Sequence, residues 1–129
     1  MVVVDASIVI EAVEGDGPAR QLLANEEVHV PHLIDAEVMQ VLRRRVLRGR
    51  LGVDAAVFGL RAWRRLGVRR HAMVGVLGRM WTLRDNLSAY DAAYVALAEL
   101  LGCDLVTTDA RLAWAPGAMC AIRVIPRSV

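Results

Sequence analysis

The sequence contains no lysine, and all 16 of its basic residues are arginine. This absence excludes a P-loop, a Schiff-base lysine and any other mechanism that needs a catalytic lysine. An all-arginine composition is typical of genome-wide bias, so the number of arginines is not evidence for a function. Their placement is more informative, because two basic segments in the middle of the chain could contact phosphates or simply form solvated helix faces. These segments contain Arg43, Arg44, Arg45, Arg48 and Arg50, and then Arg61, Arg64, Arg65, Arg69 and Arg70.

Cysteines and long apolar runs are also scarce. The two cysteines, Cys103 and Cys120, fit no metal-ligand spacing and no disulfide framework, so we expect two buried or half-buried thiols in a reducing compartment. No apolar run approaches the ~20 residues of a membrane span. Met1 leads directly into an apolar strand with no basic region before it, which does not fit a signal peptide. We therefore expect a cytoplasmic protein without a membrane segment.

The 129 residues, 56% of them hydrophobic, are enough for one domain with its own core, spanning 1–129. Short apolar runs alternate with segments of helical periodicity along most of the chain. This alternation predicts an α/β fold, a three-layer α/β/α sandwich around a mostly parallel sheet of four or five strands. The expected strands are 2–4, 28–30, 68–70, 105–107 and 121–125. The expected helices are 8–13, 18–24, 33–48, 55–66, 73–81 and 89–101.

Asp5 directly follows the first strand, Val2–Val4, whose continuous β-branched residues are typical of a strand buried on both faces. Ser7 is expected to cap the helix that follows. Open α/β sheets bind ligands at the carboxyl ends of their strands, which makes Asp5 a candidate ligand-binding residue. Alternatively, Asp5 is a loop residue that only accepts hydrogen bonds from nearby backbone N–H groups.

The segment from Ser88 to Leu112 is predicted to form a helix, a turn, a strand and a second turn, with one carboxylate near each end. Ser88 is a good N-cap with Asp91 three residues later, and Gly102 is a plausible helix stop. Asp109 follows the strand. Each aspartate could be only a cap, Asp91 at the positive end of the helix dipole and Asp109 before the short turn 110–113.

The helix expected at 33–48 carries two acidic residues near its start. Ile34, Val38, Val41 and Leu42 mark its inner face, and Glu37 lies on or beside this stripe. A carboxylate in that position needs a partner, and either a metal ion or an arginine could serve. Asp35 points away from the stripe and is expected to be solvated. In the next two helices, Val57, Leu60 and Trp63, and then Val76, Leu77 and Met80, are expected to face the core.

Asp5, Glu37, Asp91 and Asp109 would converge on one edge of a doubly wound sheet, where strand carboxyl ends and helix N-termini meet. Four such carboxylates cannot all ionise without a neutralising partner, and a divalent cation resolves the conflict. Ligands that are all oxygen atoms suit Mg²⁺ or Mn²⁺ rather than Zn²⁺. A site of this kind is typical of enzymes that hydrolyse phosphodiester bonds.

These residues lie in motifs that resemble PIN-domain ribonucleases of the VapC toxin type. The matching landmarks are VVVDAS at the N-terminus, the helix start around Pro31, Glu37 and Val38, then RDNLSAYDAAYVALAE and LVTTDARLA. The resemblance implies that Asp5, Glu37, Asp91 and Asp109 form an acidic Mg²⁺ site that cleaves structured RNA of the tRNA or rRNA class. It also implies neutralisation by a cognate VapB-like antitoxin, places Ser7 and Thr107 near the metal, and suggests a homodimer. Trp63, Trp81 and Phe58 could contribute to that dimer or belong to the core.

Three other functions are compatible with part of this pattern. A receiver-like signalling domain also gathers acids at strand ends, but it needs a lysine that the chain lacks. A non-catalytic PIN fold could bind RNA or a partner, although the presence of all four acids argues against a decayed site. A PIN nuclease that processes RNA or cuts DNA is compatible with the same residues, and only analogy favours the toxin.

Overall fold

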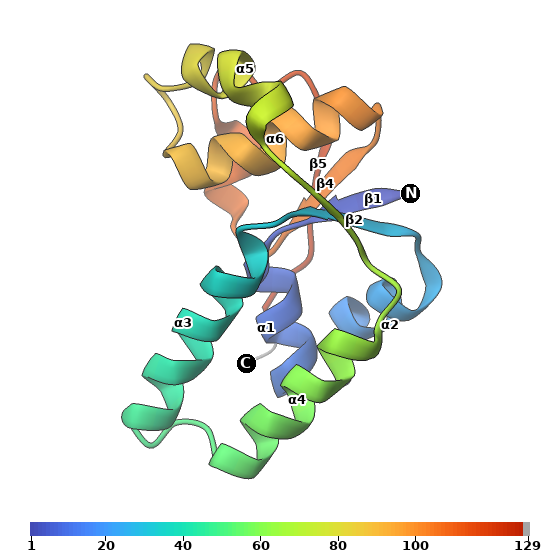
Figure 1. The fold of residues 1–129 in the computed structure, drawn as a ribbon, viewed down its shortest axis with the longest axis vertical. Helices are drawn as coiled ribbons and strands as arrows, with labels where there is room; N and C mark the ends of the chain where they lie inside the picture. The colour runs from blue at the N-terminus through green and yellow to red at the C-terminus, as the bar shows by residue number, and fades with distance from the viewer. Residues whose placement is uncertain (128–129) are drawn as a thin grey trace.

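The computed structural model describes residues 1–127 and shows an all-parallel sheet of five strands between two layers of helices (Figure 1). The strand order is β3-β2-β1-β4-β5. The strands are β1 (Val2–Val4), β2 (Val28–Pro31), β3 (Arg69–His71), β4 (Asp104–Thr107) and β5 (Ile122–Val124). The predicted three-layer α/β sandwich is therefore confirmed, with the larger of the two expected strand numbers.

Four helices cover one face of the sheet and two cover the other (Figure 1). The first layer holds α1 (Ala6–Glu14), α2 (Pro18–Asn25), α3 (Ile34–Leu47) and α4 (Val53–Arg65). The second layer holds α5 (Leu77–Thr82) and α6 (Ala89–Leu101), and two 3₁₀ turns, η1 (Val74–Val76) and η2 (Ala110–Trp114), complete the fold. Among residues 1–127, no helix is both long enough and apolar enough to cross a membrane.

Strand β1 lies at the centre of the sheet, and all three of its valines are buried. From β1 the chain first adds β2 and β3 on one side, and later β4 and β5 on the other. The direction of winding thus changes between β1 and β4. This switch point is where open α/β sheets bind ligands, because the loops after the two strands diverge there.

Helix α6 begins and ends as the sequence predicts. The Ser88 side chain accepts a hydrogen bond from the Asp91 backbone N–H, and Gly102 ends the helix in the left-handed conformation at φ 66°. The helix is more deeply buried than a single apolar face implies, since the seven residues from Ala92 to Ala98 are all buried. Leu100, expected on the inner face, is exposed. The acidic first turn of α6 is therefore anchored by a helix that lies almost wholly in the core.

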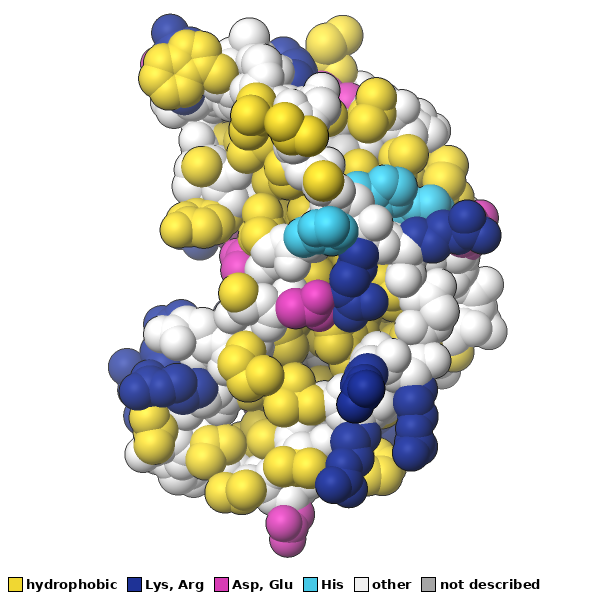
Figure 2. Space-filling model, in the orientation of Figure 1, with side chains coloured by type: hydrophobic (Ala, Val, Ile, Leu, Met, Phe, Trp, Pro, Cys, Tyr) yellow, Lys and Arg dark blue, Asp and Glu magenta, His cyan; other side chains and the backbone are white. Residues whose placement is uncertain are grey.

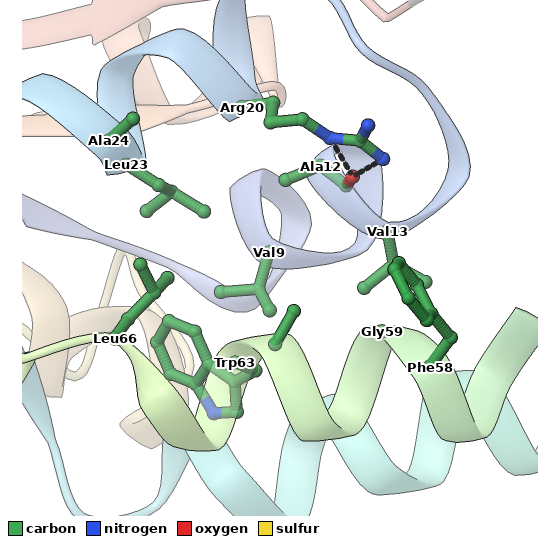
Figure 3. A pocket seen from close by; sticks show the side chains of 11 residues that line it. Val9, Ala12, Val13, Arg20, Leu23, Ala24, Phe58, Gly59, Trp63 and Leu66 are labelled. Atoms are coloured by element: carbon green, nitrogen blue, oxygen red, sulfur yellow. Dashed lines mark hydrogen bonds between the residues drawn. The ribbon is translucent and has the colours of Figure 1, made fainter.

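Trp63 and Leu60 of helix α4 face the core as predicted, but the helix also packs against α1 through a small residue, Gly59. The buried residues of α4 are Ala56, Gly59 and Trp63, whereas Val57 is 39% exposed. A Cβ on Gly59 would lie 2.6 Å from Val13 Cγ1, so only glycine allows this approach of the two helices. Figure 3 shows Val13 directly above Gly59, in an apolar groove of about 270 Å³ between α1, α2 and α4.

The segment predicted as one helix over 73–81 is divided into η1 and α5. Val76 is buried as expected, but Leu77 is 55% exposed, so its predicted place in the core is wrong. The chain enters this segment from the edge strand β3, which matches the strand expected at 68–70 within one residue. Cys103 and Cys120 are both half-buried free thiols, as predicted.

Candidate active site

Asp5 lies at the carboxyl end of β1 and is the N-cap of α1, a role that the sequence analysis gave to Ser7. One carboxylate oxygen accepts hydrogen bonds from the Ser7 backbone N–H at 3.1 Å and from the Ser7 hydroxyl at 2.5 Å. The other oxygen accepts the Thr107 hydroxyl at 2.5 Å. Asp5 is only 8% exposed, and this burial raises the pKa of its carboxyl, although the hydroxyl hydrogen bonds from Ser7 and Thr107 lower it.

The Ser7 and Thr107 hydroxyls also connect β1 to the loop after β4. Each of these hydroxyls donates to Asp5 and also accepts a backbone hydrogen bond. The Ser7 oxygen accepts the Thr108 N–H at 2.9 Å, and the Thr107 oxygen accepts the Asp109 N–H at 3.0 Å. Two small polar side chains therefore fix the Asp5 carboxylate and hold the backbone that carries Asp109. The predicted proximity of Ser7 and Thr107 to the acidic residues thus has a structural basis.

Glu37 lies in the first turn of α3 and is half-buried, as its position beside the apolar stripe predicts. Its Oε1 atom accepts a hydrogen bond of 2.5 Å from the hydroxyl of Tyr94, in the buried middle of α6. Burial raises the pKa of the Glu37 carboxyl, the Tyr94 hydrogen bond lowers it, and the charges of Asp5 and Asp91 raise it further. Tyr94 was not predicted as a site residue, because a tyrosine in an apolar helix is indistinguishable from an ordinary core residue. Its spacing of one turn after Asp91 was the only available signal.

Asp91 lies in the first turn of α6 and is half-buried. Burial raises the pKa of its carboxyl, and the negative charge of Asp109 raises it further, whereas a hydrogen bond with Ser88 and the charge of Arg111 lower it. The capping role is filled by Ser88, whose hydroxyl accepts the Asp91 backbone N–H at 3.1 Å. Ser88 is therefore the N-cap, and Asp91 lies in the first turn at the positive end of the helix dipole, as the capping alternative for it supposes.

Asp109 does act as a cap, the alternative considered for it. It is the N-cap of η2 and accepts the Arg111 backbone N–H at 3.0 Å. The Arg111 guanidinium donates two further hydrogen bonds of 3.1 Å to the same carboxylate, and they hold the pKa of Asp109 below its ordinary value. Arg111 itself is exposed, so solvent screens this ion pair.

The four acidic residues come together at the carboxyl edge of the sheet, although not as a finished metal site. The negative charge of Asp91 raises the pKa of both Asp5 and Glu37, and the negative charge of Asp109 raises the pKa of Asp91. Yet within residues 1–127 no three acidic, histidine or cysteine side chains are arranged so that they could hold a metal ion. Three of the carboxylates are turned to partners of their own: Asp5 to Ser7 and Thr107, Glu37 to Tyr94, and Asp109 to Arg111.

The chemistry of this donor set fits a hard divalent cation. All four candidate ligands are carboxylates. Burial raises the pKa values of Asp5, Glu37 and Asp91, and the charge of a neighbouring carboxylate raises each of them further, a repulsion that a cation would relieve. In the described part of the chain, none of these three carboxylates forms an ion pair with an arginine. Asp5, Glu37 and Asp91 therefore lack a bound arginine within residues 1–127, whereas Asp109 has Arg111.

The chain as a whole is similar to members of a known protein family. A family model described as "PIN domain" matches residues 2–117. Ribonuclease VapC9 of Mycobacterium tuberculosis (strain H37Rv) is 54% identical over 127 residues, which cover 98% of this chain and 100% of the relative. Ribonuclease VapC1 of the same strain is 41% identical over 128 residues, covering 95% of this chain and 96% of the relative.

Solved structures share the fold at lower sequence identity. The M. tuberculosis protein VapC20, described as a sarcin-ricin-loop-cleaving toxin, superposes with a TM-score of 0.64 at 21% identity, covering 87% of this chain and 92% of that one. A toxin–antitoxin complex from Klebsiella pneumoniae contains a chain with a TM-score of 0.68 at 18% identity, covering 100% of both chains. At these identities the likeness concerns the fold alone.

Proposed function

The chain belongs to the PIN-domain family, among relatives of the VapC type, and we propose that it is a metal-dependent endoribonuclease and the toxin of a toxin–antitoxin pair. The observation that carries this proposal is the group of carboxylates at the switch point of the sheet, three of which have raised pKa values and no arginine partner. The name ribonuclease, borne by the relatives that match almost the whole chain, adds to it. VapC20 is described as cleaving the sarcin-ricin loop, which favours a structured RNA of the tRNA or rRNA class as substrate.

Asp5, Asp91 and Asp109 are the proposed ligands of Mg²⁺ or Mn²⁺, and Glu37 is a further ligand or orients the attacking water. When bound, the cation supplies positive charge that stabilises the transition state of phosphodiester hydrolysis. Ser7 and Thr107 keep Asp5 in one orientation through the two hydroxyl hydrogen bonds. The Tyr94 hydroxyl occupies only Oε1 of Glu37, so the other oxygen is available to accept a proton or a hydrogen bond from water.

A cognate VapB-like antitoxin is the proposed partner, supported by the toxin–antitoxin complex among the structures with the same fold. The chain would act in the cytoplasm, where both RNA and antitoxin are found. A homodimer stays a prediction. Trp63 is buried in the core and no longer supports it, whereas Phe58 and Trp81 remain as large exposed apolar side chains, 75% and 68% exposed.

The test is cleavage of total RNA by antitoxin-free protein in Mg²⁺, in Mn²⁺ and in EDTA. Wild-type protein, Asp5→Ala and Asp16→Ala are compared, because Asp16 is an exposed loop residue whose removal changes the net charge equally. We expect discrete products that need the cation, disappear with Asp5→Ala and persist with Asp16→Ala. Sequencing the product ends would identify the RNA and the cut position. Folded protein that cuts no RNA under either ion would overturn the proposal in favour of a non-catalytic binding module.

A further inference from the structure

The arginines of this chain divide into two classes according to their contacts. Nine of the 16 donate to a carboxylate, a backbone carbonyl or a hydroxyl. These nine are Arg20, Arg45, Arg69, Arg70, Arg79, Arg84, Arg111, Arg123 and Arg127. The other seven form no ion pair or side-chain hydrogen bond with any described residue, and all of them are exposed. They are Arg43, Arg44, Arg48, Arg50, Arg61, Arg64 and Arg65. The unpartnered positive charge is thus confined to the end of α3, the turn after it and α4.

Two of these free arginines, Arg44 on α3 and Arg48 at the C-cap of that helix, lie on the same side of the helix as Glu37. Arg44 and Arg48 follow Glu37 by seven and eleven residues, which brings each of them to within about 20° of its direction around the helix axis. Along the axis they lie about 10 and 16 Å beyond Glu37. Helix α3 therefore presents one line of side chains that starts at the acidic residues and ends in two exposed guanidinium groups.

Figure 2 shows where charged side chains gather on one face of the molecule. The surface is hollowed on the left, between the α5–α6 layer and α3, and an acidic side chain is visible within the hollow. A group of basic side chains lies beside it over the lower part of α3, and a second group lies on the opposite side over α4. On α4, Arg61, Arg64 and Arg65 line a shallow hollow of their own. The two basic groups are therefore separate surfaces, and only the group on α3 borders the acidic hollow.

Such a line suits an RNA strand whose scissile phosphate lies at the acidic residues. Carboxylates repel phosphates, so the binding energy that holds the strand must come from cationic groups further along it. Guanidinium groups bind phosphate oxygens through paired hydrogen bonds, and free ones need not first leave a carboxylate. With about 3.4 Å of rise per phosphate in a stacked strand, Arg44 and Arg48 would meet phosphates about three and about five nucleotides from Glu37.

We propose that Arg44 and Arg48 form a phosphate-binding track on α3, which holds the RNA strand beside the bond that is cut at the acidic residues. This inference rests on the proposed nuclease function and adds the surface that positions its substrate. The α4 arginines are not part of the track. The contacts are made to the backbone, so the track contributes affinity and register rather than base specificity.

The test compares two double variants that remove the same charge from the two basic surfaces. Arg44→Gln with Arg48→Gln alters the track, and Arg61→Gln with Arg64→Gln is the matched control on α4. Both are made in an Asp91→Asn background, which prevents cleavage, and are titrated with a fluorescein-labelled hairpin RNA at several salt concentrations. Backbone contacts are independent of sequence, so the hairpin need not be the natural substrate. Circular dichroism melts check that both variants are folded.

For the track variant we expect affinity for the hairpin to fall about tenfold at a fixed salt concentration. The slope of log K against log salt should decrease by about 1.4 to 1.8, since each lost phosphate contact contributes about 0.7 to 0.9. The control should change the slope by much less. In the active protein, the track variant should need about tenfold more RNA for half-maximal cleavage and keep its rate at saturation.

Two results would overturn the inference while leaving the nuclease intact. One is wild-type affinity and salt dependence in the track variant. The other is an equal loss in both double variants, which would mean that only total charge matters. A track variant that keeps RNA binding but no longer binds the antitoxin would assign the surface to that partner, also against the inference. Wild-type protein that cleaves no RNA would instead contradict the proposed function.

Discussion

Asp35 and Glu37 lie two positions apart in the first turn of α3, on nearly opposite sides of the helix, and their carboxylates have opposite environments. Asp35 accepts the Trp63 indole N–H at 2.8 Å and two hydrogen bonds from the Arg70 guanidinium at 2.7 and 2.9 Å. These contacts hold the pKa of Asp35 below its ordinary value. Within residues 1–127, Glu37 has only the Tyr94 hydroxyl as a partner, and burial with the nearby negative charges raises its pKa.

The difference separates carboxylates that stabilise the fold from carboxylates that the fold holds ready for a ligand. Asp35 joins α3 to α4 and to β3, and its negative charge is neutralised by an arginine of the same chain. In the described part of the chain, Glu37, Asp5 and Asp91 have no such partner, and repulsion from neighbouring carboxylates opposes folding unless a cation is bound. Asp109 is intermediate between these two groups of carboxylates. It is paired with Arg111, but Arg111 is exposed and can move away without opening the core.

The largest effect is expected from Asp91→Asn, which should reduce RNA cleavage below detection because a proposed ligand is lost. The folded protein in metal-free buffer should be equally stable or more stable. A carboxyl whose pKa is raised by folding is destabilised in its ionised form at neutral pH, and the amide removes that charge. Cleavage assays and thermal melts on the same preparation check both statements. A fully active variant would exclude Asp91 from the site.

Asp35→Ala should act in the opposite sense, on stability rather than on cleavage. It leaves the indole N–H of the buried Trp63 without its acceptor, which costs about 1–3 kcal/mol. For a domain of this size the melting temperature should fall by roughly 3–10 °C. Asp54→Ala, an exposed acid in the first turn of α4, is the matched control. Loss of cleavage per folded molecule in Asp35→Ala would show that the two carboxylates are not functionally separate.

Tyr94→Phe should lower the cleavage rate about tenfold, because groups that orient a ligand or base typically contribute at that level. The ring stays in the core, so the change in stability should be about that of one hydrogen bond, ~1 kcal/mol. Tyr90→Phe removes the other hydroxyl of this kind in the chain, on an exposed side chain of the same helix, and should leave the cleavage rate unchanged. Equal rates in the two variants would mean that Glu37 needs no orientation by Tyr94.

The decline in the free energy of unfolding at acidic pH should depend on Asp35. Its folded pKa lies below the ordinary value of 3.8, so its contribution to stability is present above that pH and is lost as the pH falls through the lowered pKa. Asp35→Asn should therefore flatten the decline in stability in this range, measured by urea unfolding at successive pH values. If Asp35→Asn leaves this pH dependence unchanged, the decline is due to other groups, such as Glu99 in its ion pair with Arg79.

Arg111→Gln should have the smallest effect. It releases Asp109 from its exposed ion pair, so that Asp109, like Asp5, Glu37 and Asp91, has no arginine partner. Mn²⁺ should therefore bind about two- to threefold more tightly. The rise in melting temperature with Mn²⁺ concentration measures this affinity. Arg123→Gln, which frees Asp104 at the start of β4, is the control and should not change it. Weaker Mn²⁺ binding in Arg111→Gln would show that Arg111 supports the site.

Local signals in the sequence predicted much of the fold and the placement of the four acidic residues at strand ends and helix starts. The buried first strand and the helix from Ser88 to Gly102 depend on β-branched residues, a cap and a glycine, which act within a few residues. On α4, Trp63 is buried and Leu60 is partly buried against the core as predicted, but Val57 was wrong, because apolar periodicity favoured it over Ala56 and Gly59. A small residue contributes little to such a pattern, and its importance appears only when a neighbouring helix approaches it.

Within the site, the sequence by itself determined which carboxylates end strands or begin helices, since these positions follow from the alternation of strand and helix. Only the tertiary structure decided which of them are neutralised. Asp35 was expected to be solvated, and although it is partly exposed, it binds an arginine 35 residues away. Tyr94 and Thr107 reach their carboxylates across 57 and 102 residues. Charge compensation depends on distances of a few Å in space, and no short-range pattern along the chain encodes those distances.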